Sequence, residues 1–179
     1  GEVDAAIESA REALVMQRKV LDSDHPMVAD GAAMLAYWSM QVGNYEEAEA
    51  LLDECLEIRE KIHGVSHPDV ASALTLKAGV LLELKRYGEA RETAHSAGEI
   101  LRANFAEDHW RVAAAANVEG AALAGLGDYY KAERLLLDSN VILSDAPMPG
   151  VADQSRQRLA TLYTSWGKNN LAQKYLAQE

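Results

Sequence analysis

Hydrophobic side chains recur along this chain at steps of three and four residues, the spacing of one face of an α-helix. Two consecutive segments show the pattern well. The first carries Val28, Ala32, Leu35, Ser39 and Val42, and the second carries Ala48, Leu51, Leu52, Cys55, Ile58 and Ile62. Gly43 lies between them, where a residue of low helix propensity favours a break. The pattern therefore predicts two helices joined by a short turn.

Two short markers return along the chain with a period of 42 residues. The segment that begins at His25-Pro26 is repeated at His67-Pro68 and, in modified form, at His109. A second marker, which begins at Gly43-Asn44-Tyr45, returns at positions 85–87 and 127–129. A period in this range predicts a stacked array, in which neighbouring units together bury a continuous apolar seam.

The first helix of each unit is expected to begin at the first marker. Asp24, Ser66 and Asp108 offer cap-type side chains there, and Pro26 and Pro68 fit a first helical turn. Shifting the pattern backward places the start of the chain inside a unit. We therefore expect nine helices in one repeat domain over residues 1–179. Its parts are a lone second helix in 1–22 and helix pairs in 24–63, 66–105, 108–144 and 149–179.

These markers resemble the tetratricopeptide repeat, in the long kinesin-light-chain-like form of about 42 residues. The resemblance is carried by residues 24–26, 66–71 and 43–52, and it covers essentially the whole chain. The closing stretch is also similar to the repeat tails of bacterial signalling proteins. The resemblance implies an all-α, right-handed superhelix (a solenoid) of antiparallel helix pairs. It also implies a scaffold that binds other proteins rather than an enzyme.

The charge and composition of the chain limit the kinds of partner that it is expected to bind. The net charge of −11 argues against nucleic acid and against an anionic membrane surface, because both require clustered Lys and Arg. No apolar run approaches the ~20 residues of a membrane span. The single cysteine, Cys55, precludes an internal disulfide and fits a reducing compartment, so we expect a cytoplasmic protein without cofactors.

In the family that the chain resembles, the first helices line a concave groove. The residues expected to face it are Met34, Tyr37, Met40, Gln41, Thr75, Leu76, Leu82, Glu83, Asn117, Val118, Gln157, Arg158 and Thr161. Thr75, Asn117 and Gln157 can hydrogen-bond an extended backbone. Met34 and Met40 offer an adaptable apolar wall, or else they merely pack against the next helix. Because only Arg158 is clearly placed to hold an acidic tail, we expect an apolar or basic segment.

Several residues depart from the repeat pattern. Lys77 and Glu119 occupy a slot that is usually Leu, so we hypothesise that they pair across the repeat boundary; the alternative is that each reaches water separately. The glycines at 120, 125 and 127 are expected to permit close helix contact. Cys55 matches Ala97 and Ser139 after the shift of 42 and predicts a small packing slot rather than a nucleophile.

The histidines do not predict a metal site. His25, His67 and His109 should lie about 10 Å apart on successive units, too far to share one ion bound at ~2 Å. His63 and His67 are close together but lack a clear third ligand. No phosphate-binding loop or catalytic set is recognisable either, so an enzyme is the least favoured reading.

Two other functions stay open beside a peptide-binding scaffold. The array could be the sensor or regulatory part of a larger signalling protein, for instance one linked to a kinase. It could also form a homodimer through its N-terminal helix, where no preceding first helix covers Val3, Met16 and Val20.

Overall fold

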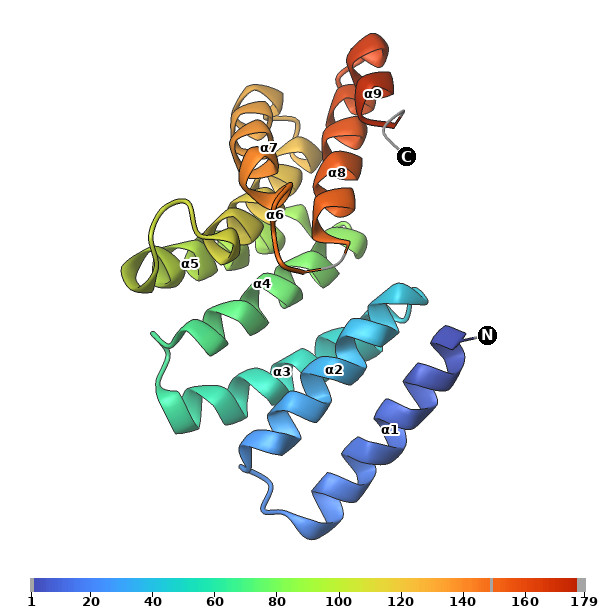
Figure 1. The fold of residues 1–179 in the computed structure, drawn as a ribbon, viewed down its shortest axis with the longest axis vertical. Coiled ribbons are helices and arrows are strands. Elements are labelled where there is room, and N and C mark those ends of the chain that lie inside the picture. The colour runs from blue at the N-terminus through green and yellow to red at the C-terminus, as the bar shows by residue number, and fades with distance from the viewer. Residues whose placement is uncertain (1, 149, 177–179) are drawn as a thin grey trace.

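The computed structural model describes residues 2–148 and 150–176, and it describes side chains from Ala5 onward. Over these residues it consists of nine α-helices and no strand (Figure 1). They are α1 (Glu2–Val20), α2 (Pro26–Gln41), α3 (Tyr45–His63), α4 (Pro68–Glu83), α5 (Tyr87–Asn104), α6 (Trp110–Gly125), α7 (Tyr129–Leu143), α8 (Val151–Ser165) and α9 (Asn169–Leu176). The predicted all-α repeat superhelix is confirmed. Among the described helices, none is both long and apolar enough to cross a bilayer.

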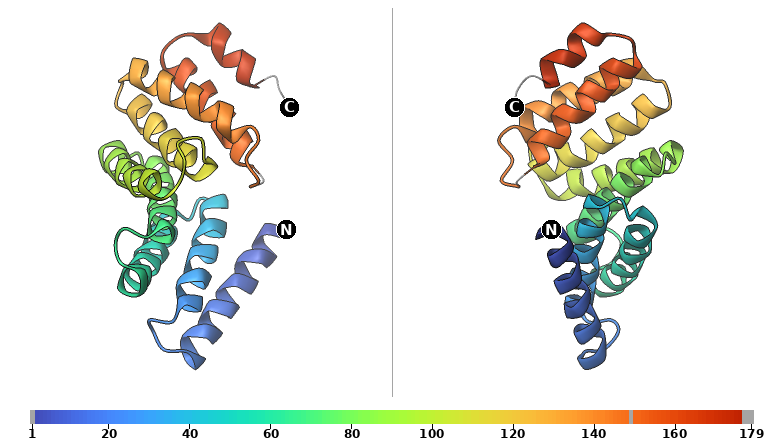
Figure 2. Two further views of the ribbon diagram at one scale, coloured as in Figure 1. Left: turned by 60° about the vertical axis from the view of Figure 1, so that its left-hand side comes forward. Right: turned by 90° about the vertical axis from the view of Figure 1, so that its right-hand side faces the viewer.

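The helices stack so that the even-numbered ones form the inner layer. Each helix contacts the next along the chain, and further contacts join α2 to α4, α4 to α6 and α6 to α8. Within the described residues, no odd-numbered helix makes such a contact with another odd-numbered helix. The even-numbered helices therefore lie closer together and line the inside of the curve. Figure 2 shows that successive pairs are also rotated relative to one another, so the stack twists as it rises.

Histidines, rather than the residues before them, cap the first helices of three pairs. The Nδ1 atoms of His25, His67 and His109 each accept the backbone N–H two residues further on, at 3.2 Å. The prediction that Asp24, Ser66 and Asp108 supply the caps was therefore wrong by one position. An imidazole reaches the free N–H groups of the first turn as a shorter cap side chain does. The repeated histidine thus has a structural explanation.

Replacing His67 with alanine is expected to lower the free energy of unfolding by about 1 kcal/mol, because α4 loses its cap. The measurement is urea unfolding followed by circular dichroism. His67→Asn is the matched control, since asparagine keeps a capping acceptor while losing the imidazole. If both variants lose the same free energy of unfolding, the imidazole ring itself, and not the capping hydrogen bond, stabilises α4.

The turn after each of the first three inner helices requires a left-handed backbone. Gly43 and Gly127 have φ values of 80° and 83°, and Lys85 takes φ 60° at the corresponding position. A left-handed conformation suits glycine and is disfavoured for lysine. The expected role of Gly127 in close helix contact was therefore wrong, since a side chain there would meet nothing within 4 Å.

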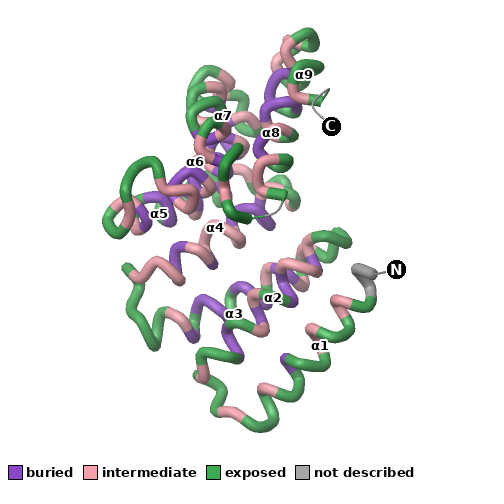
Figure 3. Tube along the Cα trace, viewed as in Figure 1, coloured by how far each residue is buried: buried purple, intermediate pink, exposed green. Residues whose placement is uncertain are grey.

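The small packing slot lies in the core. Cys55, Ala97 and Ser139 are all buried, as the repeat pattern predicted. Burial raises the pKa of the Cys55 thiol, which disfavours the reactive thiolate. Figure 3 shows buried positions gathered on the middle helices, whereas α1 is exposed along most of its described length.

Candidate functional site

All of the predicted groove residues lie on the four inner helices, but they differ in exposure. The exposed ones are Met34, Gln41, Glu83, Gln157 and Thr161. The partly buried ones are Tyr37, Met40, Thr75, Leu76, Leu82 and Arg158, and the buried ones are Asn117 and Val118. The inner face is thus a candidate binding surface whose character changes along the stack.

The apolar end of this face is formed by α2. Met34 is 60% exposed, whereas Met40 packs against the core, with its Cε atom close to Gly79 of α4. The ring of Tyr37 meets Trp38 edge to face, with centroids 5.3 Å apart. Met40 therefore packs against the next inner helix, which was one of the two alternatives. Met34 is exposed and can contact a ligand, which was the other.

The middle of the face is closed by a buried polar network. The Asn117 amide donates to the Ser139 hydroxyl at 2.8 Å and to the Ser155 hydroxyl at 3.0 Å. Its Oδ1 accepts a hydrogen bond from Nη1 of Arg158 at 2.8 Å. Asn117 is only 1% exposed, so the prediction that it bonds a ligand backbone was wrong.

Three other members of the predicted set make contacts within the fold. Val118 is buried against Ala78 and Ala94, so it does not face a groove. The hydroxyl groups of Thr75 and Thr161 donate to the carbonyl oxygen four residues earlier, each at 2.9 Å. Their oxygens can still accept a hydrogen bond, but their protons are already used.

Arg158 faces a desolvated environment. Burial lowers the pKa of its guanidinium to about 10, and the negative charge of Glu83 partly offsets this effect. The side chain therefore stays charged at neutral pH while its hydrogen bond to Asn117 holds it within the network. Glu83 in turn lies 3.5 Å from the Tyr45 hydroxyl, which donates to it.

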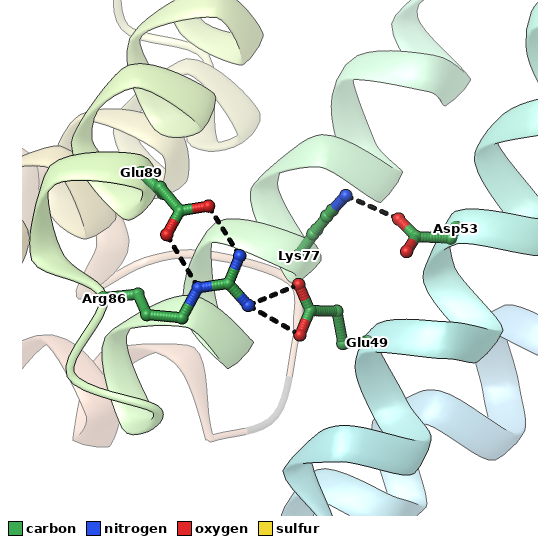
Figure 4. Close-up of polar contacts among 5 residues, drawn as sticks. All are labelled: Glu49, Asp53, Lys77, Arg86 and Glu89. Carbon is green, nitrogen blue, oxygen red and sulfur yellow. Dashed lines mark hydrogen bonds and ion pairs between the residues drawn. The ribbon is translucent and has the colours of Figure 1, made fainter.

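The predicted pair between Lys77 and Glu119 does not form. Lys77 reaches back to Asp53 on α3, with 2.5 Å between Nζ and Oδ1 (Figure 4). Glu119 instead lies beside His95, with 3.2 Å between Oε1 and Nδ1. The pairing hypothesis was therefore wrong. As its alternative holds, the two charges reach the surface separately, and each makes an exposed contact with a partner on an outer helix.

The same region carries a second ion-pair cluster. The Arg86 guanidinium lies 2.8 Å from both carboxylate oxygens of Glu49 on α3. It also makes two hydrogen bonds to Glu89 on α5, at 2.7 Å and 2.5 Å. Figure 4 shows this bridge beside the Lys77–Asp53 pair. These ion pairs join neighbouring helix pairs. They therefore stabilise the fold rather than bind a ligand.

One group of potential metal ligands comes together at the turn between α3 and α4. Ligand atoms of His63, His67 and Asp69 lie within 4.8 Å of one another. Sequence reasoning found both histidines but missed Asp69, whose position two residues after His67 is the available signal. The two rings stack at 4.3 Å, and Nδ1 of His67 already accepts the Asp69 N–H. A metal at that nitrogen would have to displace the helix cap.

The N-terminal helix leaves apolar side chains uncovered. Met16 is 62% exposed and Val20 is 68% exposed, and Val15 beside them is 42% exposed. The side chain of Val3, which was expected to share this surface, lies outside the described residues.

Comparisons with known proteins agree with this geometry. Two family models, both described as tetratricopeptide repeat, match residues 30–103 and residues 1–26, together more than half of the chain. No curated protein matches the sequence.

Solved structures share the fold at low identity. The nearly identical repeats of a putative kinesin light chain from Podosopora anserina are 24% identical, with a TM-score of 0.72 over 99% of this chain and 85% of that one. BtubC from P. vanneervenii is 20% identical, with a TM-score of 0.71 over 99% of this chain and 72% of that one. A Rap protein complexed with Competence and Sporulation Factor is 21% identical, with a TM-score of 0.79 over 97% of this chain but 47% of that one.

Proposed function

The chain belongs to the tetratricopeptide repeat family, and from this premise we propose that its inner face binds a peptide or helical segment of a partner protein. Repeats of this family are typically interaction modules without enzymatic activity. Every helix contacts the next, which supports our proposal that the array acts as one repeat domain.

The proposal rests on the side chains that stay exposed on the inner helices. They contact one another and the outer helices, yet Met34, Gln41, Glu83, Gln157 and Thr161 stay exposed on them. These side chains come from three different inner helices. A surface of this kind, with an apolar anchor and several polar groups, suits a short protein segment.

The charges on this face favour an apolar or basic segment. Arg158 is held by Asn117 within the fold, whereas Glu83 is exposed. An acidic tail would meet Glu83 without gaining a free cation, and the chain as a whole carries a net charge of −11. We therefore place the apolar part of the segment on Met34 and Tyr37, with a basic residue toward Glu83.

The Rap structure supports capture of another molecule by such an array, because that protein is complexed with Competence and Sporulation Factor. Our chain spans under half of the Rap protein's length. This fraction motivates a sensory or regulatory role within a larger signalling protein of the bacterial cytoplasm, as a variant of the same proposal.

Selection of random peptides displayed on phage tests the proposal. We expect enrichment of apolar and basic sequences, and a loss of affinity of at least about tenfold in Met34→Glu, which puts an acid where an apolar anchor should sit. Val65→Glu is the matched control, because Val65 is 64% exposed but lies in the α3–α4 turn. Enrichment of acidic peptides, or equal losses in both variants, would overturn the proposal.

Self-association is the second candidate, and the exposure of Met16 and Val20 favours it. Two copies could cover these side chains by packing their α1 helices together. Small-angle scattering should then show a dimer that Met16→Glu dissociates. A monomer at every concentration would remove this candidate.

A further inference from the structure

In two helix pairs a side-chain contact joins the start of the inner helix to the end of the outer helix. In the pair α2–α3 a salt bridge joins them, from Lys61 near the end of α3 to Asp24 just before α2. In the pair α4–α5 a hydrogen bond joins them, from the Asn104 amide to the Ser66 carbonyl at 3.4 Å. Both contacts tie the two ends of a pair together.

Among the described residues, the pair α6–α7 shows no such tie. Moving Asp24 and Lys61 by two repeat periods leads to Asp108 and Asp145, so an acid stands where the first pair has a lysine. Helix α7 also ends at Leu143, which leaves Asp145 in the turn that follows. Neither carboxylate makes an ion pair or a side-chain hydrogen bond with any residue that the structure describes.

An open groove of about 500 Å³ lies at this place. The residues that line it include Asp108, Asp145 and the apolar residues Trp110, Val141, Ile142 and Pro147. Val141 is 71% exposed, so much of this apolar wall is uncovered. We call this the α6–α7 groove. It lies where α6 begins, whereas Gln41 and Glu83 lie at the opposite ends of their inner helices.

The other charged groups nearby do not cancel both carboxylates. The guanidinium of Arg111 lies over the rings of Phe105 and Trp110, at 5.6 Å and 5.5 Å from their centroids. The guanidinium of Arg102 is paired with Glu107, with 3.4 Å between Nε and Oε1. His109 accepts the N–H of Arg111 at Nδ1, which an unprotonated nitrogen must do. Neither arginine lines the groove, so its lining holds two acids and no arginine or lysine, among walls that are otherwise mostly apolar.

We propose that the α6–α7 groove receives a lysine side chain from a segment of a partner protein. The ammonium would take the place that Lys61 fills in the first pair and would meet Asp108 and Asp145. The four-carbon stem would lie along Val141 and Ile142, since lysine buries its stem while its head stays with charged groups. This site is separate from the inner face, so a partner could be held at two places.

A pair of capped pentapeptides tests the proposal: one has leucines around a central lysine, and the other has glutamine in place of the lysine. The indole N–H resonance of Trp110, observed in ¹H–¹⁵N spectra, is the readout. We expect the lysine peptide to shift it with a dissociation constant on the order of 1 mM, and the glutamine peptide to bind at least about tenfold more weakly.

Asp145→Lys should abolish binding, because it recreates within the chain the pair that Lys61 makes with Asp24. Asp22→Lys is the charge-matched control on an exposed residue and should leave the affinity within about twofold. The thermal midpoint provides an independent readout, since the new lysine should raise it only in Asp145→Lys. Equal binding of both peptides, or equal losses in both variants, would overturn the proposal.

Discussion

Replacing Asn117 with leucine is expected to lower the free energy of unfolding by about 3 kcal/mol, although the two side chains are similar in size. The substitution removes the acceptor for the Arg158 guanidinium and the donor for the hydroxyls of Ser139 and Ser155. Each group left without a partner in a desolvated site adds its own cost. Urea unfolding followed by circular dichroism measures the loss.

Asn117→Asp separates polarity from shape in the same experiment. A carboxylate can accept from Arg158, and the Ser155 hydroxyl can rotate to donate to it. We therefore expect less than half of the loss seen with leucine. If the leucine variant is as stable as the original chain, the network of Asn117 is not what holds α6, α7 and α8 together.

Replacing Gly120 with valine is expected to lower the free energy of unfolding by about 2 kcal/mol. Gly120 is buried where α6 meets α7. A Cβ atom there would lie 2.9 Å from Cγ of Leu136 and 3.2 Å from Cβ of Leu135. Atoms close to the backbone of α7 cannot move aside as the tip of a long side chain does, so the two helices must separate.

The control for Gly120 is Gly88→Val on α5. Gly88 is exposed, and a Cβ atom there would meet nothing within 4 Å. Because valine has a slightly higher helix propensity than glycine, the stability should change by no more than about 0.5 kcal/mol. Equal losses at the two positions would point to the backbone, rather than to the α6–α7 contact, as the cause.

Of the three glycines grouped together in the third pair, two do permit close approach and one does not. Gly120 meets Leu136, and a Cβ atom at Gly125 would lie 2.5 Å from the Tyr87 ring. Gly127 serves the left-handed turn instead. The sequence places all three in the third pair but does not distinguish a contact from a turn, since both favour the smallest residue.

The sequence predicted which helices carry the candidate groove residues but not the surroundings of the individual side chains. The four inner helices follow from the repeat, and Met34 is exposed on them as expected. Asn117 was misplaced because an amide that suits a ligand backbone suits buried serines equally well. The capping histidines were misassigned because short polar residues stand directly before each of them and are the commoner caps.

By itself, the sequence determined the nine helices of the described residues, the order in which they stack and the small buried slot at Cys55, Ala97 and Ser139. These features depend on local helical periodicity and on similar packing positions repeated every 42 residues, so each copy of the pattern supports the others. The partners of Lys77, Glu119 and Asn117 were decided only by the tertiary structure. Those side chains reach residues 22 to 41 positions away on other helices, and a difference of a few ångströms in helix packing selects among several equally charged or polar partners.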